Sequence, residues 1–196
     1  MKTVRIGCGA GYSGDRIEPA VEMAEKGGIR YLVFECLAER TIAIAQQARR
    51  RDPAAGFDPL LAARMEACLP ACRKNGVKIV TSMGAANPPA GARTIRDVAR
   101  RLGIGGLKIA AVTGDDVLEA IRAHDPVLLE TGERVSRLGD RLVAANAYLG
   151  AGPVVEALEN GADAVITGRV ADPSLFLAPA IYEFGWDMNN WDLLGQ

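Results

Sequence analysis

The sequence has 196 residues, of which 49% are hydrophobic, and its formal net charge is −1 at pH 7. A chain of this length and apolar content can bury a substantial core as one domain. Because the charge is nearly balanced, no basic field exists to hold nucleic acid or an anionic membrane, and neither is expected as a partner.

The composition also bears on location and metal binding. No apolar run approaches the ~20 residues that a membrane-spanning helix needs, and the start of the chain lacks a signal-peptide core, so a cytoplasmic location is expected. The four cysteines are expected to be free thiols. Cys68 and Cys72 lie one helical turn apart, but no second cysteine pair or histidine pair accompanies them, so we predict buried apolar residues and no metal site.

The first expected strand runs into a glycine-rich stretch with the sequence IGCGAGYSGDR at 6–16. Its Gly9, Gly11 and Gly14 have the G-x-G-x-x-G spacing, which can bring backbone N–H groups against a phosphate at a helix N-terminus. Glu35 follows the next apolar run, a few residues later than the acidic residue that binds the ribose in dinucleotide folds. Two interpretations remain: a phosphate-binding loop, or a turn that lets a helix pack closely on a strand.

Further along the chain, helical and strand patterns alternate. Strands are predicted at 31–34, 77–81, 107–112 and 164–167. Helices are predicted at 15–26, 41–51, about 60–74, 92–102, 115–123 and 153–160. Turn residues within 127–143 favour a small β-hairpin insertion.

This alternation predicts an α/β fold, a mostly parallel open sheet with helices on both faces, Rossmann-like, in a single domain over 1–196. A closed barrel would also alternate, but five or six strands favour the open sheet. In either fold the loops after the strands gather at one edge, where ligands bind. The polar residues expected there are Ser13, Asp15, Arg16, Glu35, Arg40, Asn87, Asp115, Asn146, Arg169 and Asp172.

These loops supply two kinds of candidate site residue. Carboxylates crowded at a sheet edge can have shifted pKa values and serve as acid–base groups; the candidates are Asp15, Glu35, Glu39 and Asp172. Cationic, amide, hydroxyl and glycine positions could hold a ligand or its phosphate; these are Gly9, Gly11, Ser13, Gly14, Arg16, Arg40, Asn87, Asn146 and Arg169. For each carboxylate the alternative is a helix cap or a partner for one of the arginines.

An internal repeat pairs the two ends of the chain. Tyr12-Ser13-Gly14 matches Tyr148-Leu149-Gly150, and Ala38-Glu39 matches Ala171-Asp172. A true repeat would make Glu39 and Asp172 equivalent carboxylates on equivalent loops; chance similarity between β-α-β units is the alternative.

Four stretches of this sequence, at 6–16, 31–41, 144–150 and 167–174, resemble the acyclic terpene utilisation protein A family, AtuA. The resemblance covers essentially the whole chain. It implies a bacterial role in the catabolism of branched acyclic terpenoids such as citronellol and geraniol, a pathway that uses acyl-CoA thioesters and a biotin-dependent carboxylase. Family members usually continue beyond the point that matches 191–196, so the chain resembles an N-terminal portion.

The leading expectation is therefore a catabolic enzyme that holds a branched acyl-CoA or related phosphate-bearing ligand, with coenzyme A entering as part of the substrate. One alternative is an NAD(P)-dependent oxidoreductase, based on the glycine spacing and Glu35. Another is a non-catalytic subunit or scaffold that associates with an acyl-CoA carboxylase. A homo-oligomer, or docking to a C-terminal portion or partner subunit, is expected.

Overall fold

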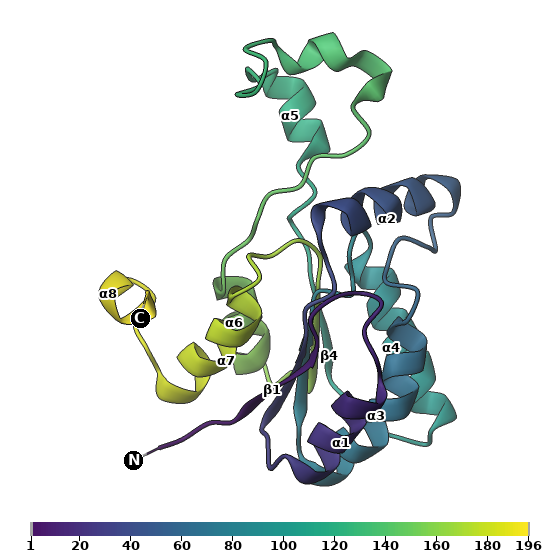
Figure 1. The fold of residues 1–196 in the computed structure, drawn as a ribbon, viewed down its shortest axis with the longest axis vertical. Helices are drawn as coiled ribbons and strands as arrows, with labels where there is room; N and C mark the ends of the chain where they lie inside the picture. Colours follow the sequence, from purple (N-terminus) through teal and green to yellow (C-terminus); the bar gives the residue numbers. More distant parts are fainter. Residues whose placement is uncertain (1, 196) are drawn as a thin grey trace.

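The fold, taken from a computed structural model that describes residues 2–195, is built on a sheet of five parallel strands (Figure 1). The strands lie in the order β1-β2-β3-β5-β4. Their bounds are β1 Ile6–Ala10, β2 Tyr31–Phe34, β3 Lys78–Thr81, β4 Ile109–Val112 and β5 Ala164–Thr167. The predicted open, parallel α/β sheet of Rossmann-like type is confirmed.

Helices cover both faces of this sheet. One face carries α1 (Glu18–Lys26), α3 (Leu61–Asn75) and α4 (Pro88–Arg101), and the other carries α6 (Gly152–Glu159) and α7 (Ser174–Phe184). The helix α2 (Glu39–Arg51) lies beyond the carboxyl ends of the strands, and the short α8 (Trp191–Leu194) follows α7 (Figure 1).

Strict alternation along the strands creates a separate core on each face. In β2, Leu32 and Phe34 pack toward α1, α3 and α4, whereas Tyr31 and Val33 pack toward α6 and α7. All four side chains are fully buried. Since consecutive side chains of a strand point to opposite faces, a short and wholly apolar strand must be covered on both sides.

The strand order reverses between β3 and β5. The chain leaves β3 toward α4 on one face and leaves β5 toward α7 on the other, so the two loops diverge at neighbouring strand ends. A divergence of this kind opens a crevice at the carboxyl edge, which is where open α/β sheets bind ligands.

Between β4 and α6 the chain forms a lobe that projects beyond the carboxyl edge (Figure 1). It contains α5 (Leu118–His124) and the 3₁₀ helix η1 (Val135–Arg141). The predicted hairpin at 127–143 is confined to an antiparallel bridge between Val127 and Arg134, because the rest of that segment is taken up by η1.

Several helices begin at positions other than those predicted, and the start differs by three residues or more in α1, α4 and α5, the last of which begins at Leu118 instead of position 115. The helix α1 begins at Glu18 instead of position 15, because the carboxylate of Asp15 accepts hydrogen bonds from its own loop. The helix α4 begins at Pro88 instead of position 92. Proline is suited to the first position of a helix, because an N–H at that position would have no hydrogen-bond partner within the helix.

Candidate functional site

A largely apolar pocket of about 500 Å³ lies at the carboxyl edge, on the side of α2. Small-molecule sites typically occupy ~300–1,000 Å³ and are mostly apolar with a few polar groups. The apolar walls come from α2, from the 55–59 segment and from the loops after β2 and β3. They include Leu37, Ile44, Ala45, Ala48, Phe57 and Met83.

One wall of this pocket is polar. The Ser13 hydroxyl donates a 2.6 Å hydrogen bond to Asp58 Oδ2, and the Leu60 N–H donates to Asp58 Oδ1 at 2.8 Å. Both Ser13 and Asp58 line the pocket, and Asp58 is only 6% exposed. Burial raises the pKa of the Asp58 carboxyl, although the hydrogen bonds from Ser13 and Leu60 and the charge of Arg64 oppose that rise.

Cys36 also lines the pocket, but its thiol is not an activated nucleophile. Burial raises its pKa to about 12, so the thiol stays protonated at neutral pH.

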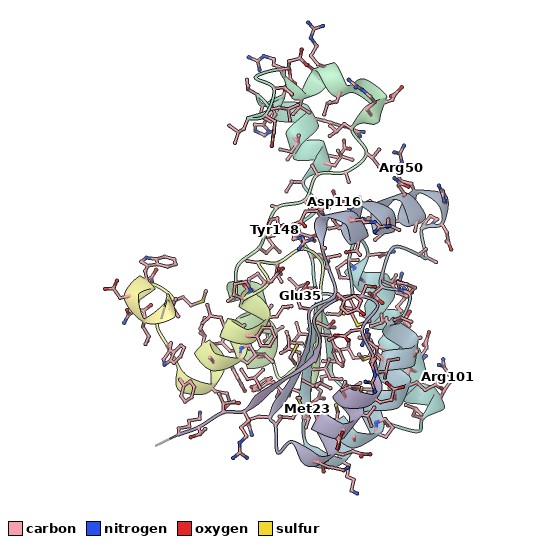
Figure 2. The ribbon with its side chains drawn as sticks, in the orientation of Figure 1. Met23, Glu35, Arg50, Arg101, Asp116 and Tyr148 are labelled. Atoms are coloured by element: carbon pink, nitrogen blue, oxygen red, sulfur yellow. The ribbon has the colours of Figure 1, made fainter. Side chains whose placement is uncertain are left out.

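Glu35 directly follows β2 (Figure 2), and its carboxylate lies beside two residues that line the pocket. Its Oε1 accepts a 2.8 Å hydrogen bond from the Leu37 N–H and lies 3.4 Å from the Ser82 hydroxyl, and both partners line the pocket. Burial raises the pKa of Glu35; the Leu37 N–H opposes this rise, and the nearby charge of Asp172 reinforces it. A half-buried carboxyl with a raised pKa is suited to acid–base work.

Arg169, in the loop after β5, is a buried cation of this edge. It is only 3% exposed, and its Nη1 lies 3.5 Å from Asp172 Oδ1. The Tyr148 ring covers its guanidinium, with 4.7 Å between the Cζ atom and the ring centroid. Its Nη2 has no hydrogen-bond partner among the described residues.

Tyr148 is in turn held by α2. Its hydroxyl donates a short hydrogen bond to Glu39 Oε1, which lowers the pKa of Glu39 and raises that of Tyr148. Glu39 and Asp172, the carboxylates paired by the internal repeat, thus both contact the unit formed by Arg169 and Tyr148.

A second buried carboxylate, that of Asp115, holds the Arg169 loop through hydrogen bonds. Asp115 Oδ2 accepts hydrogen bonds from the Arg169 N–H at 2.8 Å and from the Asn146 amide at 3.0 Å. A Cβ at Gly168 would lie 2.5 Å from the same oxygen, so this close approach requires glycine. Asn146 also accepts a 3.3 Å bond from Gln46 of α2, which links the lobe to the site.

The backbone N–H groups of the glycine loop are not arranged as in a diphosphate-binding loop. The Gly11 N–H donates to Asp15 Oδ2 at 3.0 Å and the Arg16 N–H donates to Oδ1 at 2.9 Å, and these bonds lower the pKa of Asp15. Asp15 therefore occupies donors that a phosphate would use. Since α1 begins only at Glu18, the loop does not present a helix N-terminus to a dinucleotide either.

Two further observations explain why this loop has its sequence. Gly9 is required because a Cβ there would lie 2.5 Å from the Phe34 ring. Arg64 of α3 is completely buried, and its Nη2 donates to the backbone oxygens of Ser13 at 3.0 Å and Asp15 at 2.8 Å. The loop is thus shaped by contacts within the protein.

The remaining predicted site residues are not among those that line the pocket. Asn87 caps α4 and ties down the 53–55 segment through the backbone oxygens of Pro53 and Ala55. Arg16 is exposed and lies 3.6 Å from Glu18, and Arg40 is exposed on α2. Gly14 adjoins the Tyr12 ring.

Three residues of this edge were not among the predicted site residues: Asp58, Arg64 and Tyr148. Asp58 and Arg64 lie far in sequence from Ser13, and their apolar surroundings give no local signal. Tyr148 could have been found through its place in the internal repeat, opposite Tyr12.

Two absences concern the part of the chain that the structure describes. Within residues 2–195, no three His, Cys, Asp or Glu side chains are grouped so that they could hold a metal ion. No helix in the same range has the length and apolarity to cross a bilayer.

Comparison with known proteins supplies the family. The sequence model of AtuA, described as acyclic terpene utilisation family protein AtuA, matches residues 4–196. The chain belongs to the AtuA family. Membership implies a role in acyclic terpene utilisation. No curated protein and no solved structure matches the chain significantly.

Proposed function

We propose that this AtuA-family chain is the ligand-binding and catalytic part of a cytoplasmic, bacterial enzyme of citronellol or geraniol degradation. Its ligand is a branched acyclic acyl group, carried as a coenzyme A thioester or a related phosphate-bearing compound. The observation that carries this proposal is the apolar pocket of about 500 Å³ at the edge where α/β sheets bind ligands. Family membership supports the acyclic terpenoid character of the ligand.

The polar groups beside the pocket suit the reactive end of such a ligand. Glu35 adjoins the pocket through Ser82 and Leu37, and its raised pKa makes it the strongest of the four predicted acid–base carboxylates. Asp15 is engaged by its own loop, and Glu39 by Tyr148. Asp172 is exposed and faces Arg169.

Calorimetric titration with coenzyme A and with citronellyl-CoA tests this proposal. Ala48→Phe places a ring in the pocket, whereas Ala43→Phe makes the same change on an exposed position of α2 outside the pocket. Citronellyl-CoA should bind the wild type and Ala43→Phe alike and bind Ala48→Phe at least about tenfold more weakly, a loss of about 1.4 kcal/mol. Equal binding of all three proteins, or no heat at millimolar ligand, would contradict the proposal.

The NAD(P)-dependent oxidoreductase is the less favoured candidate. The loop that would hold the pyrophosphate has its Gly11 and Arg16 N–H groups bonded to the Asp15 carboxylate, which would repel a diphosphate. Addition of the protein to NADH should leave the NADH fluorescence unchanged. An enhancement would show that NADH binds and would favour the oxidoreductase.

The projecting lobe favours a second role, association with another subunit. Leu129 is 97% exposed and Val127 is 53% exposed, and both lie on the segment that follows α5. Docking to a carboxylase, to a C-terminal portion or to a second copy would cover them. Substituting both residues by Ser should then abolish co-purification of the partner or shift the sedimentation coefficient; unchanged behaviour would argue against this role.

A further inference from the structure

We propose that the Arg169 guanidinium is the anion-binding group of this edge and that it takes a phosphoryl or carboxylate group through its free Nη2 edge. This inference deepens the proposed function, because it names the residue that holds the charged end of the ligand. The inference can be wrong while the proposed function is right, and the reverse, because a small anion can bind Arg169 without occupying the apolar pocket.

The first argument is the burial of an incompletely paired cation. Arg169 is 97% buried, yet its contact with Asp172 is 3.5 Å long and involves Nη1 alone, and Nη2 has no protein partner in residues 2–195. Leaving a buried charged donor unpaired costs more free energy than leaving a neutral donor unpaired, so a native structure retains one only with an explanation.

The second argument is the geometry of the guanidinium. Tyr148 lies over its face at 4.7 Å, so a hydrogen-bond partner has to approach along the N–H edge in the ring plane, and because Nη2 is itself enclosed by protein, an anion must displace neighbouring atoms to reach it. A planar fork of N–H donors matches the paired oxygens of carboxylate and phosphoryl groups. The stacking thus fixes the plane without using the donors.

The third argument is that the position of Arg169 is preset. Its N–H is bonded to buried Asp115 at 2.8 Å, and the preceding Gly168 packs against the same carboxylate. It follows β5, beside the divergence of the β3 and β5 loops. A group fixed in place before binding loses little entropy when the ligand arrives.

The surrounding carboxylates are compatible with an anion. Glu39 is bonded to Tyr148, and Glu35, whose pKa is raised by burial, gives up a proton less readily than an exposed glutamate. Among residues 2–195, Asp172 is the one carboxylate within ion-pair distance of Arg169, and at 59% exposure it is well solvated. We therefore expect Asp172 to compete with the anion for the guanidinium.

Anion titrations at low ionic strength test the inference, with inorganic phosphate and acetate as separate probes. We compare the wild type with Arg169→Gln, Arg169→Lys and Asp172→Asn, and with Arg134→Gln as a control on an exposed arginine of the lobe. Binding of at least one anion should be saturable in the wild type and in Arg134→Gln. It should weaken about tenfold or more in both Arg169 variants and strengthen several-fold in Asp172→Asn.

Each outcome supports or overturns the inference. Binding of phosphate alone indicates that the ligand carries a phosphoryl group, and binding of acetate alone indicates a carboxylate. Binding of both anions also supports the inference. Absence of saturable binding in the wild type, or equal binding in the Arg169 variants, would overturn it and leave an ordered water as the partner of Nη2. If the Arg169 variants do not fold, Asp172→Asn decides, and unchanged affinity there overturns the inference. Binding of phosphate by Ala48→Phe separates this site from the apolar pocket.

Discussion

The Ser13 hydroxyl donates a 2.6 Å hydrogen bond to the Asp58 carboxylate, joining the loop after β1 to a segment 45 residues further along the chain. The contact closes one wall of the apolar pocket. It also places a carboxyl group where water has little access, which raises its pKa. The same pair therefore shapes the pocket and makes stability depend on pH.

Asp58→Asn should show this dependence. A carboxyl group with a raised folded-state pKa binds more protons when folded, so its contribution to stability is complete below the unfolded pKa and is lost as the pH rises through the folded pKa. The free energy of unfolding of Asp58→Asn should thus increase relative to wild type across that interval. Urea unfolding from acidic to neutral pH measures it, and a constant difference between the two proteins would contradict the expectation.

Gly168→Ala should destabilise the protein by about 1–3 kcal/mol, as overpacking does. The new Cβ would lie 2.5 Å from Asp115 Oδ2, which also holds the Arg169 N–H. Gly150→Ala is the matched control, since no atom lies within 4 Å of a Cβ there. Chemical denaturation compares the two variants, and equal stability would show that the loop moves freely away from Asp115.

Arg64→Met should destabilise the protein by about 3 kcal/mol, because two backbone oxygens of the glycine loop lose a charged, buried donor. Arg73→Met is the control on the same helix: Arg73 is exposed, and within residues 2–195 its guanidinium makes a single hydrogen bond, 3.3 Å long, to the Gly105 oxygen. It should change stability by less than ~0.5 kcal/mol. The midpoint and slope of urea unfolding report both effects.

Asp15→Asn should lower stability at neutral pH, with the opposite pH dependence to Asp58→Asn. The N–H groups of Gly11 and Arg16 lower the folded-state pKa of Asp15. Its contribution is therefore present above the unfolded pKa and is lost as the pH falls through the folded pKa. The wild type and the variant should converge in acid, whereas Glu25→Gln, at an exposed position of α1, should track the wild type throughout. Divergence in acid would contradict the loop geometry.

Local sequence patterns were sufficient for the sheet. The uniformly apolar run at 31–34 predicted a strand buried on both faces, and β2 has that position. The alternation of strands and helices predicted a parallel sheet with its loops at one edge, because right-handed crossovers leave few other arrangements. Helix starts were less predictable at α1, where a side chain competes for the backbone N–H groups.

The sequence by itself determined the α/β class, the edge where the polar loops gather and the family resemblance, since each depends on periodicity or on contiguous residues. The tertiary structure alone decided which of those residues meet. It engaged the glycine-loop N–H groups of Gly11 and Arg16 with Asp15, brought Asp58 to Ser13 and left the Nη2 of Arg169 without a protein partner among residues 2–195. These contacts depend on burial and on distances between segments remote in sequence, which no local pattern encodes.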